Sequence, residues 1–294
     1  MVWTPKGYDW VWERFVDKPG PDYHYTHGSP RENFYTDKTG LYDRLEQSYD
    51  ARFYQQEVGG EYLNISSGQV YYAFDRRRHV APQQYTPGLP ICWALDFNVN
   101  PMCSVIAQVI DTTSHFDRMN GRTFKKLVIL DEICLPDSHI NQACAEFVRR
   151  TEKWTKNGPV LVELYGDATG RQRQHGGSTN WKMVQDFFGF QSGYRINQNN
   201  IDRSNPLVKD RVNSVNAALS NARGEQSVWM DPQCNELRKD LEQCVWKADM
   251  SGNLVGDIDE KDSKRTHVSS ALGYLIWKQL PVKSTGGFSN KAVY

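Results

Sequence analysis

The sequence lacks the features of a membrane or secreted protein. No apolar run approaches the roughly 18 residues that a membrane-spanning helix needs. Met1 is followed by VWTPK rather than by basic residues and a hydrophobic stretch, so no signal peptide is indicated. No internal repeat or low-complexity tract occurs either. These absences predict a soluble protein.

Excess charge is also absent, because 35 basic residues balance 35 acidic ones. This balance argues against a histone-like or tail-driven nucleic-acid binder. It is still compatible with local basic clusters around an acidic, metal-loaded centre.

The cysteines form neither a CxxC pair nor a Cys/His zinc spacing. Their pattern therefore predicts reduced thiols in the core of a cytoplasmic protein. The six residues are Cys92, Cys103, Cys134, Cys144, Cys234 and Cys244.

The length of 294 residues predicts two domains, or one large domain with an appendage. Hydrophobic residues make up 39% and aromatic residues 12% of the chain, which excludes wholesale disorder. The N-terminal part is rich in Tyr, Asp, Gly and Pro, and Gln83–Pro90 has the Pro/Gly content of a linker. We therefore expect one domain over residues 1–88 and another over residues 89–294.

Hydrophobic periodicity after this boundary predicts alternating strands and helices. Expected strands cover residues 90–96, 103–110, 124–133, 159–165, 194–197 and 227–230. Expected helices start at residues 136–138 and cover 180–188, 206–222, 234–248 and 267–279, with one earlier helix over 41–58. Three strands joined by short turns, then helix and strand in alternation, predict an α/β protein with a mixed sheet. An antiparallel meander precedes βα units, and helices flank both faces. This order resembles a ribonuclease H-like nuclease core.

Two aspartates stand where predicted strands end. Asp96 closes the first strand, and Asp167 follows the fourth. If these strands are neighbours, both carboxylates project from one sheet edge, and their repulsion is offset by Mg²⁺ or Mn²⁺. In a two-ion centre one ion lowers the pKa of the attacking water and the other stabilises the leaving oxygen. The alternative for each aspartate is a turn or cap residue.

Several stretches resemble the C-terminal part of a tailed-bacteriophage terminase large subunit, a DNA-packaging motor with an attached nuclease. WTPKGYDW (3–10) is similar to a segment that follows the Walker B strand, and YQQEVGGEY (54–62) to the end of the motor domain. LDFN (95–98), YGD (165–167) and THVSSALGYL (266–275) follow the order of the nuclease motifs. The resemblance covers nearly the whole chain.

The first departure from that family concerns the nucleotide site. No G-x-x-x-x-G-K-[S/T] occurs, so the loop that cradles phosphates is missing and no ATPase activity is expected. Residues 1–88 are then a remnant of the ATPase domain, left by a truncated or split reading frame, and residues 89–294 the RNase H-like nuclease domain.

The second departure is Ser270, which stands where the family usually has the aspartate that is its third metal ligand. A hydroxyl is a weaker ligand for a hard cation. The favoured interpretation is a similar site with reduced metal affinity, in which His267, one helical turn away, substitutes for the lost ligand. Two alternatives remain: Asp259 or Asp262 supplies the ligand, or the site is inactive.

Basic residues near these motifs suit contacts with DNA phosphates, because a guanidinium binds two oxygens at once. The candidates are Arg171, Arg173, Arg76, Arg77, Lys264 and Arg265. A solvated surface is the alternative for each cluster. Glu132, at another strand end, is an outside candidate for positioning water or metal, although an exposed polar role is favoured.

The resemblance implies a metal-dependent endonuclease that cuts concatemeric duplex DNA without strong sequence preference. It implies Mg²⁺ or Mn²⁺ as two ions, the portal protein and the terminase small subunit as partners, no membrane, and a location in the host cytoplasm outside the virion. One alternative is an inactive DNA-binding or portal-docking fragment. Another is a different RNase H-like enzyme such as a resolvase; a β-hairpin within residues 248–260 beside the site would favour the terminase.

Overall fold

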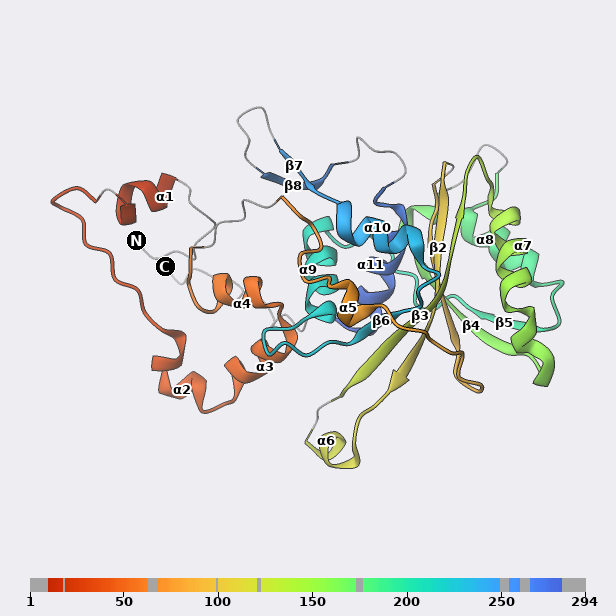
Figure 1. The fold of residues 1–294 in the computed structure, drawn as a ribbon, viewed down its shortest axis with the longest axis horizontal. Helices are drawn as coiled ribbons and strands as arrows, with labels where there is room; N and C mark the ends of the chain where they lie inside the picture. Colours follow the sequence, from red (N-terminus) through yellow and green to blue (C-terminus); the bar gives the residue numbers. More distant parts are fainter. Residues whose placement is uncertain are drawn as a thin grey trace.

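The computed structural model describes residues 10–17, 19–62, 68–98, 100–120, 123–172, 177–248, 254–259 and 265–281 (Figure 1). The helices are α1 (Trp10–Trp12), α2 (Phe34–Asp37), α3 (Leu41–Ser48), α4 (Ala51–Glu57), α5 (Arg76–His79), α6 (His115–Met119), α7 (Ile140–Thr151), α8 (Asn180–Phe188), α9 (Val208–Leu219), α10 (Asn235–Gln243) and α11 (His267–Gln279). The π and 3-10 helices are η1 (Glu13–Asp17), η2 (Pro30–Glu32), η3 (Glu152–Asn157) and η4 (Ala168–Arg171). Within the described part of the chain, no helix is long and apolar enough to cross a membrane.

A six-stranded mixed sheet organises the molecule, in the order β5-β4-β1-β2-β3-β6. Its strands are β1 (Ile91–Asp96), β2 (Met102–Asp111), β3 (Lys125–Leu135), β4 (Val160–Gly166), β5 (Tyr194–Asn197) and β6 (Val228–Met230). β2 runs antiparallel to both β1 and β3, whereas the β1–β4, β4–β5 and β3–β6 pairs are parallel. The predicted meander followed by βα units, an RNase H-like arrangement, is therefore confirmed.

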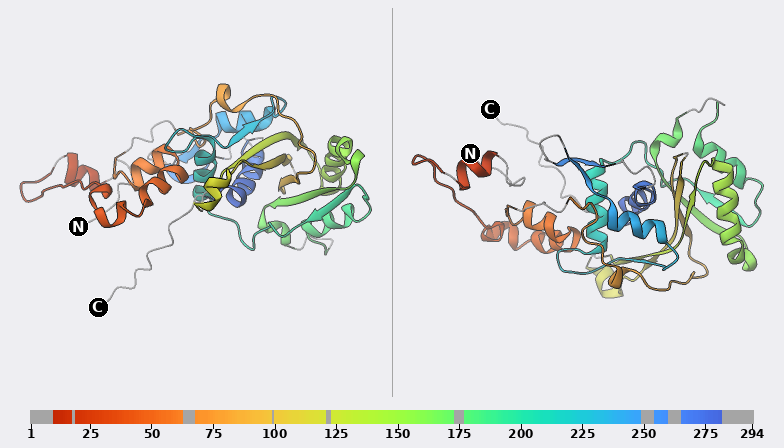
Figure 2. Two further views of the ribbon diagram at one scale, coloured as in Figure 1. Left: turned by 90° about the horizontal axis from the view of Figure 1, so that it is seen from below. Right: turned by 45° about the horizontal axis from the view of Figure 1, so that its top comes forward.

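The two faces of the sheet carry separate hydrophobic cores, because successive side chains of a strand point to opposite sides. Along β1, Cys92 and Ala94 join the core formed with α9, α10 and α11. Trp93 and Leu95 join the core formed with α7 and α8, where the Trp93 ring stacks on Phe147 with centroids 4.3 Å apart. Figure 1 shows these two helical layers on either side of the strands, and Figure 2 gives the same arrangement from two other directions.

The expected helix over residues 41–58 is wrong in one respect, because it is broken into α3 and α4. Asp50 is the reason: its carboxylate caps α4 by accepting the Phe53 N–H at 3.0 Å. Its backbone also forms an isolated bridge with Asn221. A residue that caps a new helix has extended dihedral angles and therefore ends the preceding helix.

The expected helix over 234–248 is also too long, since α10 ends at Gln243. The Cys244 carbonyl instead accepts the Val70 N–H at 3.0 Å, and the Trp246 N–H donates to the Gly68 carbonyl at 2.7 Å. The chain then forms β7 (Trp246–Ala248), which pairs antiparallel with β8 (Leu254–Ile258). The hairpin expected within residues 248–260 is thus present, two residues earlier than expected, while residues 249–253 between its strands lie outside the described part of the chain.

Residues before the expected boundary at residue 88 share the core of the sheet. Val70 and Tyr71 are buried with side chains of α9, α10 and α11. The helices α2, α3 and α4 lie beyond α9, on its side away from the sheet (Figure 1). All six cysteines are free thiols and five of them are buried, as their spacing predicts.

Candidate metal centre

The ends of β1 and β4 bring the two predicted aspartates to one edge of the sheet. Leu95 pairs with Gly166 in the parallel register, so Asp96 and Asp167 follow directly on neighbouring strands. The Asp167 N–H donates to the Leu95 carbonyl at 3.4 Å. Carboxyl ends of adjacent parallel strands meet at the same edge, which is where ligands bind in open α/β sheets.

Asp167 is held by the loop that follows it. Its Oδ1 accepts the Thr169 N–H at 2.7 Å and the Asn205 amide at 2.7 Å. Asn205 in turn accepts the Ala168 N–H at 2.8 Å, so a single amide orients both the carboxylate and its loop. The Trp181 indole donates to the Asp167 carbonyl at 3.0 Å. The carboxylate is therefore held in a defined orientation by its own loop and by Asn205.

Asp96 meets the first residue of α11. His267 Nδ1 lies 3.1 Å from Asp96 Oδ2, and the Asn98 amide lies 3.0 Å from the same ring. His267 therefore lies next to the first aspartate, as the sequence-based interpretation requires. Because a neutral imidazole and an imidazolium both hydrogen-bond to a carboxylate, this geometry is compatible with a ligand or a proton-transfer role.

Ser270 faces a cation that the sequence analysis did not identify. Arg211, on α9, donates from Nη2 to Ser270 Oγ at 3.2 Å, and its Cζ lies 4.5 Å from the centre of the Tyr274 ring. Burial raises the pKa of Tyr274 to about 12; the Asp167 and Asp96 charges also raise it, and Arg211 opposes them. Ser270 follows His267 by one turn of α11, and His267 contacts Asp96, so Arg211 is linked to the first aspartate through this helix. A sequence signal existed, because Arg211 interrupts the apolar stripe of α9 at a buried position.

The residues present fit one divalent ion. Among the residues that the structure describes, no three His, Cys, Asp or Glu side chains are grouped to hold a metal. Mg²⁺, however, is commonly held by one or two carboxylates, with waters and substrate phosphates completing its shell, and Asp96 and Asp167 are two carboxylates at adjacent strand ends. Asp259 follows β8, where its N–H donates to the Val245 carbonyl at 2.9 Å, and it joins no three-residue group. Asp262 lies outside the described residues.

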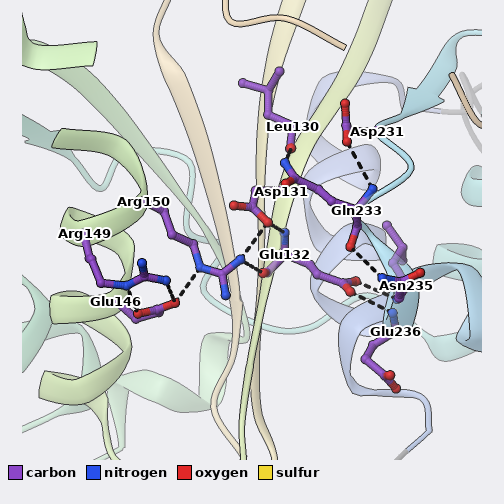
Figure 3. Close-up of polar contacts among 11 residues, drawn as sticks. Leu130, Asp131, Glu132, Glu146, Arg149, Arg150, Asp231, Gln233, Asn235 and Glu236 are labelled. Carbon is purple, nitrogen blue, oxygen red and sulfur yellow. Dashed lines mark hydrogen bonds and ion pairs between the residues drawn. The ribbon is translucent and has the colours of Figure 1, made fainter. Parts of the chain in front are cut away.

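Glu132 caps a helix (Figure 3). Its two carboxylate oxygens accept the Glu236 and Leu237 N–H groups, each at 2.7 Å, at the start of α10. Burial raises its pKa, and these two hydrogen bonds oppose the rise. Asp131 points to the opposite face of β3, where it pairs with Arg150 at 2.7 Å. The carboxylate of Glu132 is therefore engaged by backbone donors.

Of the predicted DNA contacts, Arg171 lies nearest in the chain to the aspartates. It ends η4, four residues after Asp167, and one of its nitrogens donates to the Ile201 carbonyl at 3.0 Å. Arg173 and Lys264 lie outside the described residues.

Two of the other predicted contacts, Arg265 and Arg76, have internal partners. The Arg265 side chain is only 11% exposed and pairs with Glu236 at 2.6 Å and Asp240 at 3.3 Å. Arg76 pairs with Glu242 at 2.9 Å. Arg76 and Arg77 lie on α5, beside β6, an edge strand separated from β1 by two strands. The structure does not bring this helix to the aspartates.

Solved structures of a phage protein share this fold. The large terminase from a thermophilic bacteriophage matches 94% of this chain with 17% sequence identity and a TM-score of 0.57. The same protein in complex with ADP gives 16% identity and a TM-score of 0.59, and in complex with ATP-gamma-S 17% and 0.58. The chain spans 61–62% of the length of those three structures. No protein-family model and no curated protein matches the chain.

Proposed function

We propose that this chain is a divalent-metal-dependent DNA endonuclease of the terminase type. The observation that carries the proposal is the parallel register of Leu95 with Gly166, which sets Asp96 and Asp167 side by side at the carboxyl edge of an RNase H-like sheet. The fold shared with a phage large terminase and the nuclease-like motifs of the sequence support the same function.

The chemistry follows from the residues at that edge. Asp96 and Asp167 would hold Mg²⁺ or Mn²⁺, which when bound lowers the pKa of a water and neutralises phosphate charge. Asn205 orients the Asp167 carboxylate, and His267, beside Asp96, is placed to hold or accept a proton at its imidazole. Ser270 would offer a neutral hydroxyl at the position of the third ligand.

Plasmid nicking tests this function. Wild-type protein with Mn²⁺ should convert supercoiled DNA to nicked and linear forms, whereas EDTA should stop the reaction. Asp96→Asn and Asp167→Asn should each reduce the rate by at least about 100-fold, because each removes a charged ligand. Asp111→Asn is the matched control. Asp111 is the last residue of β2, which runs antiparallel to β1, so it lies at the opposite end of the strands from Asp96. Equal activity of Asp96→Asn and the control would reject the proposal.

We further propose that Arg171, with Arg173 and Lys264, contacts the DNA backbone. The affinity for a duplex should fall steeply as the salt concentration increases. In a plot of log K against log salt concentration, Arg171→Ala should make the slope shallower by about one unit. Arg149→Ala is a suitable control, because Arg149 is 68% exposed on α7 and pairs with Glu146. A similar slope for wild type and Arg171→Ala would exclude this contact.

The remaining parts of the proposal concern the larger assembly. The sequence contains no phosphate-binding loop, and we propose that the chain itself hydrolyses no ATP. Its partners would be duplex DNA, a portal protein and a terminase small subunit in the host cytoplasm.

A second candidate function is a DNA-binding or portal-docking fragment with weak or no cleavage. The hydrogen bond from Arg211 to Ser270 favours it, because it places a cation at the position where the resemblance to terminases implies a third acidic ligand. Duplex binding without Mn²⁺-dependent nicking would support this candidate.

A further inference from the structure

Arg211 lies beside Ser270, the position at which the resemblance to terminases implies an acidic ligand. Its side chain is buried, with 7% relative exposure of the residue. The helices α9 and α11 approach closely beside it, because a Cβ on Gly273 would lie 2.7 Å from Arg211 Cγ and 2.8 Å from Cδ. Glycine at position 273 therefore makes room for the arginine stem.

The polar end of Arg211 has few partners. Nη2 donates to Ser270 Oγ, and the guanidinium carbon lies over the Tyr274 ring. Nε is buried and finds no hydrogen-bond acceptor among the described residues. A buried guanidinium cannot lose its proton in proteins, so the charge stays in place. Among the described residues, no carboxylate lies within ion-pair distance of this guanidinium, whose hydrogen bond goes to the Ser270 hydroxyl.

The charge of this neighbourhood suits one divalent ion better than two. A centre with three carboxylates offsets much of the charge of two divalent ions. Here only two carboxylates are available, and the Arg211 guanidinium lies against Ser270, so a second ion beside Ser270 would be repelled by Arg211. A serine hydroxyl that already accepts an N–H is a poor ligand for that ion.

We propose that the Arg211 guanidinium takes the place of a second metal ion, so that the centre holds one divalent cation, bound by Asp96 and Asp167. This inference rests on the proposed function and refines it, since two ions were expected from the sequence. Arg211 acts as a fixed positive charge beside Ser270.

Titration calorimetry with MnCl₂, without DNA, measures the stoichiometry on the full chain. Wild type should bind one Mn²⁺ that Asp96→Asn removes. Ser270→Asp alone should still bind one, because Arg211 pairs with the new carboxylate. The double variant Ser270→Asp/Arg211→Met should bind two. Lys209→Met combined with Ser270→Asp is the control, because Lys209 is an exposed cation on the same helix, and it should bind one.

Several outcomes would overturn the inference. These are two Asp96-dependent ions in the wild type, two ions in Ser270→Asp, no Asp96-dependent ion at all, or a single ion in a folded double variant. The Ser270→Asp result keeps the test decisive if Arg211→Met impairs folding, which circular dichroism would reveal. Cleavage is scored separately: one bound ion without nicking would reject the endonuclease and leave the one-ion centre intact.

Discussion

Gly166 and Leu95 approach each other more closely than any other residue type at position 166 would allow. A Cβ at Gly166 would lie 2.2 Å from the Leu95 carbonyl oxygen, and the φ angle of Gly166 is +148°. Both conditions demand glycine. This contact joins β1 to β4 one residue before Asp96 and Asp167, so it sets the spacing of the two carboxylates.

Replacing Gly166 with alanine should therefore be severe. We expect Gly166→Ala to lower the free energy of unfolding by about 3–5 kcal/mol, because a backbone clash adds to the strained φ. Gly158→Ala is the control: Gly158 has a φ of +122° but no atom within 4 Å of an added Cβ, and should cost only about 1–2 kcal/mol. Urea unfolding measures both, and equal losses would contradict the close approach.

Asn205 should matter for metal affinity although it is not a predicted ligand. Asn205→Ala removes the amide that orients Asp167, so the Mn²⁺ concentration for half-maximal cleavage should rise about 10–100-fold. Asn200 lies in the same loop as Asn205, and its amide donates to the Tyr165 hydroxyl. Asn200→Ala should leave the Mn²⁺ concentration for half-maximal cleavage almost unchanged. A rise shared by both variants would indicate a general effect of the loop instead.

Glu132 should affect stability and not cleavage. Glu132→Ala leaves two N–H groups at the start of α10 without their acceptor, at a cost of about 1–3 kcal/mol. Glu132→Gln retains an acceptor oxygen and should lose less. The nicking rate of folded protein should equal that of wild type in both variants; a selective loss of nicking in Glu132→Gln would restore Glu132 as a candidate for positioning water or metal.

Asp50 should make stability depend on pH. Burial raises its pKa from 3.8 to about 6, against hydrogen bonds from the Phe53 and Arg52 N–H groups and the Arg52 charge. Because the folded-state pKa is the higher one, the contribution is fully present below about pH 4 and is lost as the pH rises through about 6. Asn caps helices equally well, so Asp50→Asn removes the ionisation alone.

The measurement is the unfolding free energy of wild type minus that of Asp50→Asn, at pH 4 and at pH 7. This difference should fall by at most about 3 kcal/mol between the two pH values. A difference that stays constant with pH would show that Asp50 ionises normally in the folded protein.

Local pattern was sufficient for most elements. The helix bounds 180–188 and 267–279 agree with α8 and α11, and the strand over 194–197 with β5. Their apolar residues repeat with the period of one secondary structure, and their ends carry caps or turns. Two predicted helices were too long because the backbone bonds to a distant segment instead. Asp50 forms a bridge with Asn221, and the Trp246 N–H donates to the Gly68 carbonyl. No local signal reports such a partner.

The site divides in the same way. The sequence alone was enough to predict the mixed sheet, the two carboxylates at strand ends and the motif that contains His267. These follow from residue order, because side-chain periodicity is a local property. Only the tertiary structure decided that Glu132 caps α10 and that Arg211 faces Ser270. Those pairs lie 104–105 and 59 positions apart, and which chemically suitable partner a side chain meets depends on how the helices pack on the sheet.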